Sequence, residues 1–169
     1  MMKAVAAKPQ MTLLCVGKLR ERFWQEAQAE YTKRLTAYST KITVVEVADE
    51  PSADNASLAD EESVRKREAD RLLSRIGERD FVVVCDGSRG QAFMSERFAH
   101  RLEQAATDGA SAWTFVIGGS LGLHETVLER ANLAVSFGAF TFPHQLMRVV
   151  LLEQLYRAAK INRGEAYHK

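Results

Sequence analysis

The residues best suited to chemistry lie in the last third of the chain, where basic and aromatic side chains gather. Residues 143–169 carry five cationic side chains against two acidic ones: Arg148, Arg157, Lys160, Arg163 and Lys169 against Glu153 and Glu165. Such a basic end can contact phosphate. From charge alone, a solvated charged face is an equally good interpretation. Glu153 and Arg157 also have the spacing and order of a helical ion pair, and a purely structural pair is the simpler interpretation.

Three glycine-containing segments are the second feature with chemical potential. Residues 86–90 (DGSRG), 118–122 (GGSLG) and 137–142 (FGAFTF) each follow a short apolar run. Glycine lets a backbone approach a ligand closely or adopt positive φ. GGSLG is not a GxGxxG fingerprint, and the sequence contains no P-loop. Taken alone, it is typical of a tight strand-to-helix turn.

The elements that must position these segments alternate between strand and helix patterns. We predict strands at 11–16, 42–47, 81–85, 113–117 and 134–137, and helices at 20–38, 60–76, 95–107, 124–131 and 144–161. This alternation predicts an α/β fold with a mostly parallel sheet and helices on both faces. Ligands of open α/β sheets bind beyond the carboxyl ends of the strands. The three glycine-containing segments leave such ends, so we expect a small-molecule pocket there.

The last predicted helix is unusual for a terminal helix. Its apolar residues cover nearly the whole circumference, which predicts burial on all sides. Such burial requires a chain that wraps the helix or a second subunit. Pro143 suits the first turn. His144 lies beside the positive end of the helix dipole, so we expect a neutral ring with an orienting or capping role.

Composition narrows the class of protein. The 169 residues and formal charge of +1 suit one domain, which we place at 11–169 after a flexible extension at 1–10. Cys15 and Cys85 lie in apolar runs and are expected to be free thiols of a reducing compartment, the cytoplasm. Residues 1–10 do not resemble a signal peptide, and no apolar run approaches a membrane span, so we expect no membrane partner. No recognisable nucleophile motif or metal-binding motif supports a hydrolase, kinase or metalloenzyme.

Four segments together carry a resemblance to a known family. FVIGGSLGL at 115–123, TFPHQLMR at 141–148, LEQLYRA at 152–158 and the final YHK resemble the ribosomal RNA large subunit methyltransferase H family, of the SPOUT class, and the likeness extends over 11–169. The resemblance implies a trefoil knot at the C-terminal end, with the last helix threaded through it in a homodimer. It also implies N3-methylation of a pseudouridine in a hairpin loop of 23S rRNA within the assembled 70S ribosome. The methyl donor would be S-adenosylmethionine.

The resemblance also assigns site residues. Those implied to bind the donor are Cys85, Gly118, Phe137, Gly138, Ala139, Phe140, Thr141 and Phe142. The chain departs from the usual family pattern at Ser120 and Ala166, where proline is commoner, and at Phe137–Gly138, where Leu-Ser is commoner. Contacts made by the backbone are expected to survive these changes.

The catalytic residues implied by the resemblance are Arg157, Tyr167 and His168. The methyl carbon is already electrophilic, so alignment and a deprotonated imide nitrogen suffice and no metal is required. Arg157 would stabilise the anionic base, His168 would accept or relay its proton, and Tyr167 would stack on RNA. Arg148 and Lys169 would contact RNA, and the tail would reach the partner subunit's pocket. The proton acceptor stays open among His168, Tyr167 and Glu153.

Two alternatives accompany this reading of the sequence. The same fold and donor would serve a methyltransferase of another rRNA uridine or of a tRNA uridine. A non-catalytic ribosome-binding module is the alternative from another class, and the glycine turn and YHK end argue against it. Donor binding measured by calorimetry separates the methyltransferases from the non-catalytic module.

Overall fold

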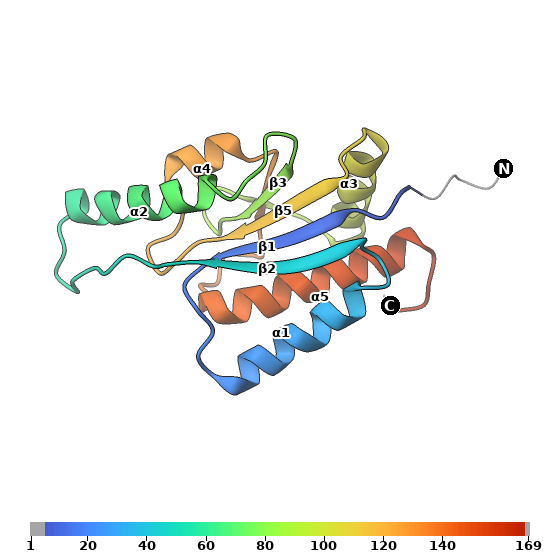
Figure 1. The fold of residues 1–169 in the computed structure, drawn as a ribbon, viewed down its shortest axis with the longest axis horizontal. Coiled ribbons are helices and arrows are strands. Elements are labelled where there is room, and N and C mark those ends of the chain that lie inside the picture. The colour runs from blue at the N-terminus through green and yellow to red at the C-terminus, as the bar shows by residue number, and fades with distance from the viewer. Residues whose placement is uncertain (1–5, 168–169) are drawn as a thin grey trace.

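The computed structural model describes residues 6–167, and within them a six-stranded parallel sheet forms the centre of the molecule (Figure 1). The strand order is β2-β1-β5-β3-β6-β4, and every neighbouring pair is parallel. The strands are β1 (Gln10–Val16), β2 (Lys41–Val47), β3 (Phe81–Cys85), β4 (Gln91–Ala92), β5 (Ala112–Ile117) and β6 (Leu133–Ser136). The predicted parallel α/β sheet is therefore confirmed.

Helices cover both faces of the sheet, as predicted. On one face lie α1 (Arg22–Leu35), α3 (Ser95–Thr107) and α5 (His144–Asn162); on the other lie α2 (Leu58–Leu73) and α4 (Glu125–Arg130). In Figure 1, α2 and α4 lie above the sheet, and α1 and α5 lie below it. Successive strand residues face opposite layers: Leu13 packs beneath α5, whereas Leu14 packs beneath α2 and α4. The apolar runs of the central strands follow from this two-sided burial.

The boundaries of two helices differ from prediction. Helix α1 starts at Arg22, and the Glu46 carboxylate accepts the Leu19 N–H at 3.2 Å just before it. Helix α2 starts at Leu58, because Ser57 and Asp60 form a capping box. Strand β4 was not predicted. Its two exposed residues have no apolar pattern, and only pairing with β6 defines them.

Helix α5 lies between α1 and α3 against the sheet. The side facing the sheet is buried: Leu151, Leu152, Leu155 and Ala158. Leu146, Val149 and Val150 are only half-buried. The chain's own helices therefore leave an incompletely covered apolar side, which we call the outer face of α5 and define by Leu146, Val149, Val150, Glu153 and Arg157.

Two sequence predictions remain predictions. The trefoil knot is one, and the division into a flexible extension at 1–10 and a single domain is the other. Residues 1–5 lie outside the described residues, while Pro9 is buried and its carbonyl accepts a hydrogen bond from Thr40. Among residues 6–167, no helix is both long and apolar enough to cross a membrane.

Candidate functional site

The three glycine-containing segments leave three adjacent strands. Strands β5, β3 and β6 are neighbours in the sheet and run in parallel. Their carboxyl ends therefore meet at one edge, where ligands of open α/β sheets bind. We call the three following segments the donor loops: residues 86–90 after β3, 118–122 after β5 and 137–142 after β6. The fold brings together all the residues predicted to bind the donor.

The donor loop after β6 offers free backbone groups and an exposed ring. Gly138 has φ +108°, and its N–H donates to the Ser136 hydroxyl at 3.2 Å. Beyond it, within residues 6–167, the N–H groups of 139–142 donate to no other residue. The Phe140 side chain is 85% exposed, which is costly for an apolar ring without a ligand or partner. This loop therefore has both polar and aromatic surface to give to a ligand.

The turn after β5 is closed on itself. The Gly122 N–H donates to the Gly119 carbonyl at 3.1 Å, and Gly122 has φ +80°. A Cβ on buried Gly118 would lie 2.9 Å from a methyl of Leu123 and 3.1 Å from the Gly122 carbonyl. A side chain at Gly118 would therefore meet the turn itself, and Leu123 and the Gly122 carbonyl would have to shift to admit it.

The donor loop after β3 presses against β6. A Cβ on Gly90 would overlap the Val135 carbonyl carbon and lie 2.6 Å from the Ser136 nitrogen. The Asp86 carboxylate accepts hydrogen bonds from the backbone N–H groups of Ser88 and Arg89. Burial opposes ionisation of Asp86, but these hydrogen bonds and the Arg89 guanidinium outweigh it and hold its pKa below the usual range. The Asp86 carboxylate therefore stays ionised near pH 7 and pairs with Arg89 of the same loop.

Cys85 ends β3 beneath this loop. Burial raises the pKa of its thiol to about 12, so the thiol is neutral near pH 7. Burial likewise raises the pKa of Cys15 to about 12. Both cysteines are free. Cys85 can therefore contribute an apolar surface and its backbone to a ligand, but not a nucleophile.

Hollows adjoin all three donor loops. One, of about 330 Å³, lies between the start of α3 and the loop after β6, against Phe137 and Gly138. Another, of about 540 Å³, lies beyond β1 and β5, against Gly119 and His144. A smaller hollow, of about 270 Å³, lies against Arg89 and Leu121. Burial, followed by the charge of Arg148, lowers the pKa of His144, so its ring is neutral as predicted, although the helix dipole was the expected cause.

Arg148 does not lie on an RNA-accessible surface, which corrects the expectation that it contacts RNA. Its side chain is 1% exposed, and its guanidinium bonds the Glu46 carboxylate at 2.6 Å and the Gly17 carbonyl at 2.9 Å. The sequence pattern could not predict this ion pair, because Glu46 is distant from Arg148 in the chain. Arg148 instead connects α5 to β2 and to the end of β1.

Arg157 and Tyr167, two of the residues predicted to be catalytic, lie together. The Arg157 guanidinium lies 4.8 Å from the centre of the Tyr167 ring and 2.6 Å from a carboxylate oxygen of Glu153, which also accepts the Tyr167 hydroxyl hydrogen bond at 3.2 Å. Burial, then the Glu153 charge, raises the pKa of Tyr167. His168 and Lys169 lie outside the described residues.

This cluster lies on the later part of α5. At about 1.5 Å per helical residue, Arg157 lies about 20 Å along α5 from His144, which follows the loop after β6. Gln154, whose side-chain amide donates to Glu153, lines the 330 Å³ hollow together with Phe137 and Gly138.

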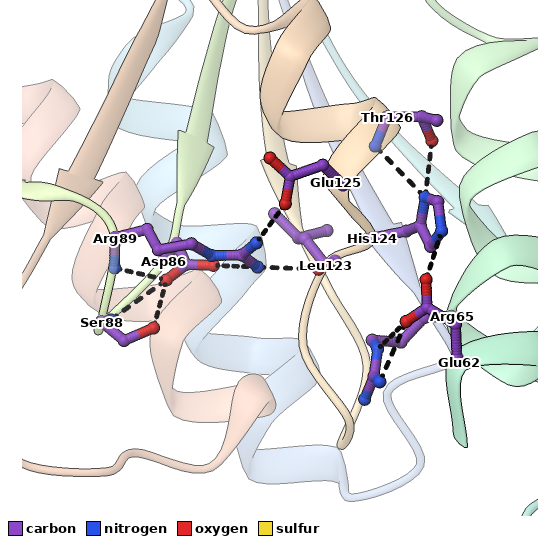
Figure 2. A network of polar contacts seen from close by, with 9 residues as sticks. All are labelled: Glu62, Arg65, Asp86, Ser88, Arg89, Leu123, His124, Glu125 and Thr126. Atoms are coloured by element: carbon purple, nitrogen blue, oxygen red, sulfur yellow. Dashed lines mark hydrogen bonds and ion pairs between the residues drawn. The ribbon is translucent and has the colours of Figure 1, made fainter. Parts of the chain in front are cut away.

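A polar network missed by sequence reasoning adjoins two donor loops (Figure 2). Arg89 bonds Asp86, Glu125 and the Leu123 carbonyl, and His124 bonds Glu62 and Thr126. The Asp86–Arg89 spacing is visible in the sequence, but the contacts between distant segments are not. No group of three or more His, Cys, Asp or Glu side chains within residues 6–167 is placed to hold a metal ion.

Sequence comparisons with known proteins identify relatives of this chain. The family model described as "Predicted SPOUT methyltransferase" matches residues 10–168. Ribosomal RNA large subunit methyltransferase H of Streptococcus suis (strain 05ZYH33) is 50% identical over 157 residues, which cover 93% of this chain and 98% of the relative. A Legionella pneumophila protein solved with the bound cofactor SAM aligns with TM-score 0.46 and 10% identity, over 90% of this chain and 67% of that one. The match along nearly the full chain shows that it belongs to the SPOUT methyltransferase family, together with ribosomal RNA large subunit methyltransferase H.

Proposed function

We propose that this protein transfers the methyl group of S-adenosylmethionine to N3 of a pseudouridine in a hairpin loop of 23S rRNA. The observation that carries the proposal is the 50% identity, over nearly the whole of both chains, to a relative named for methylation of large-subunit ribosomal RNA. The three adjacent donor loops support it independently, because they form a ligand edge of the expected kind. Residues of this chain account for each part of the activity.

The donor loops fit an adenosine-containing ligand. The unpaired N–H groups of 139–142 can bond ring nitrogens, and exposed Phe140 can cover an apolar face of the ligand. Neutral Cys85 adds an apolar floor at the end of β3. S-adenosylmethionine, when bound, supplies a methyl carbon that is already electrophilic. The protein's task is then to align that carbon with the target nitrogen.

The Arg157 cluster fits the RNA side of the reaction. The Arg157 guanidinium can stabilise the negative charge on a deprotonated imide, and the Tyr167 ring can stack on a base. The raised pKa of Tyr167 keeps its hydroxyl protonated near neutral pH, which argues against it as the proton acceptor. Glu153 and His168 remain the candidates for that role. Lys169 is proposed to contact RNA phosphate.

A homodimer would bring the two groups of residues together. The outer face of α5 is apolar and incompletely covered, and a second copy is the simplest way to bury it. Within one chain, Arg157 lies about 20 Å along α5 from His144, which follows the donor loop after β6. We therefore propose that Arg157, Tyr167 and the tail of one subunit complete the donor pocket of the other. The dimer is proposed to act in the cytoplasm on the assembled 70S ribosome.

The test is a comparison of RNA substrates. Purified protein, labelled S-adenosylmethionine and either 70S ribosomes, free 23S rRNA or total tRNA are incubated, and labelled nucleotides are located by mass spectrometry. Label at N3 of a pseudouridine in 23S rRNA, greatest with 70S ribosomes, is the expected result. Label in tRNA or at another uridine would replace the proposed target. Absence of donor binding by calorimetry would instead support a non-catalytic module.

A further inference from the structure

The Arg89 guanidinium joins two segments of the protein that are distant in the sequence. It lies in the donor loop after β3 and bonds the Asp86 carboxylate of the same loop at 3.1 Å. It also donates to the Leu123 carbonyl at 2.9 Å and to the Glu125 carboxylate at 3.1 Å, both beyond the turn after β5 (Figure 2). Within residues 6–167, these are the only hydrogen bonds between residues 86–90 and residues 118–125.

The segment that receives Arg89 is itself held from the opposite side. The His124 Nδ1 accepts the Thr126 N–H at 3.2 Å and thereby caps α4. The other ring nitrogen of His124, Nε2, lies 2.8 Å from the Glu62 carboxylate of α2. These two contacts hold His124, and with it the neighbouring Leu123 carbonyl, against α2 and α4. Arg89 extends this support to the loop after β3.

We propose that Arg89 is a positioning residue that holds the donor loops after β3 and β5 at a fixed separation, so that the methyl donor meets a preformed site. This inference rests on the proposed function. Strands β3 and β5 are paired only as far as Cys85 and Ile117, so the loops beyond them need another connection. A planar guanidinium with several donors suits this role, because it can satisfy a carboxylate and a carbonyl at once.

A direct role in binding an anionic ligand is the competing explanation. The Arg89 side chain is 44% exposed, so its charge can attract a ligand carboxylate or an RNA phosphate. Lysine separates the two roles. An ammonium keeps the charge, and hence the attraction, but lacks the fork needed for both Asp86 and Leu123.

The chain also supplies a matched control. Arg130 ends α4, and its guanidinium donates to the carbonyls of Gly77 at 2.8 Å and of Asp80 at 3.2 Å, before β3. It thus joins the same helix to the other end of the same strand, away from the donor loops. Loss of Arg130 reports the cost of such a connection for stability alone.

The experiment compares Arg89→Gln, Arg89→Lys and Arg130→Gln with the wild-type protein. S-adenosylmethionine affinity is measured by calorimetry, KM and kcat by methyl transfer, and Tm by scanning calorimetry. We expect both Arg89 variants to bind the donor about tenfold more weakly, with a raised KM for the donor, because partly exposed charged hydrogen bonds contribute modestly. Arg130→Gln should lower Tm by about as much as Arg89→Gln does, and it should leave donor affinity unchanged.

Three results would overturn the inference. Wild-type affinity in Arg89→Gln would show that the connection is dispensable. Wild-type affinity in Arg89→Lys alone would assign Arg89 to direct charge attraction. Equal weakening in Arg130→Gln would show a general effect of stability. If the wild-type protein itself binds no donor, the proposed function fails instead, so the two failures are distinguishable.

Discussion

At the scale of single residues, the donor loops depend on close backbone contacts that only glycine permits. Gly90 is the clearest case, because the backbones of β6 and of its own loop occupy the space where a side chain would begin. Gly87, in the same loop, has open space around the same position and no positive φ. The two glycines look alike in the sequence and differ only in the fold.

Gly90→Ala should therefore destabilise the protein, and Gly87→Ala should not. Overpacking of this kind costs about 1–3 kcal/mol, and the overlap here is with backbone that cannot rotate away. Urea unfolding followed by circular dichroism measures the change in free energy. Equal stability of the two variants would mean that the loop does not press against β6.

Arg148 was expected from the sequence to contact RNA, whereas in the structure it is buried and paired with Glu46. Arg148→Ala should cost about 3–5 kcal/mol of folding free energy, since removal leaves Glu46 without its buried partner. Arg22→Ala, which loses only an exposed pair with Glu26, is the control and should change stability little. At a temperature where it stays folded, Arg148→Ala should bind RNA as well as the wild-type protein. Weaker RNA binding by a folded variant would restore the original RNA assignment.

At the scale of elements, the sequence predicted most of the fold because each long element has its own periodicity. The buried strand FVVVC and helix α3 were placed correctly from pattern alone. Strand β4 was missed because two exposed residues carry no pattern. Helix α1 was predicted to reach Tyr38, which continues the apolar periodicity, but Tyr38 lies in the turn after the helix and its N–H donates to the Leu35 carbonyl.

The C-terminal tail is the element with the most specific proposed role. Deletion of Tyr167, His168 and Lys169 should abolish methyl transfer while donor affinity and secondary structure stay nearly intact, because Tyr167 is only half-buried and all three residues follow the end of α5. Transfer is measured on ribosomes, donor binding by calorimetry and folding by circular dichroism. Transfer at the wild-type rate would show that the tail is dispensable, and failure to fold would show that it is structural.

At the scale of the whole molecule, the strand order brings the donor loops together at one edge of the sheet. The Arg157 cluster lies on the later part of α5. The neighbourhood of β5, β3 and β6 follows from the crossovers of the fold, so the pocket edge could be foreseen from the βαβ pattern. The contacts of Arg89 and Arg148 could not be foreseen, because each joins segments far apart in the chain. Residues that act across segments are visible only in the fold.

Formation of a dimer is central to the proposal, because Arg157 lies about 20 Å along α5 from His144, which follows the donor loop after β6. Val150→Asp, on the outer face of α5, should convert a dimer into a monomer, because a charge would be buried in an apolar interface. Light scattering should give twice the 18.9 kDa chain mass for the wild-type protein and the single mass for the variant. Ala29→Asp, on the exposed side of α1, is the control. A wild-type monomer that retains activity would contradict the proposed dimer.

The most direct test of the central claim is methyl transfer to rRNA lacking the modification. Ribosomes are isolated from cells without this gene and incubated with the purified protein and labelled S-adenosylmethionine, and modified nucleotides are mapped by mass spectrometry. The proposal predicts one new N3-methylpseudouridine in 23S rRNA, absent without protein and absent with the tail deletion. Unlabelled 23S rRNA, despite donor binding by the same preparation, would contradict it.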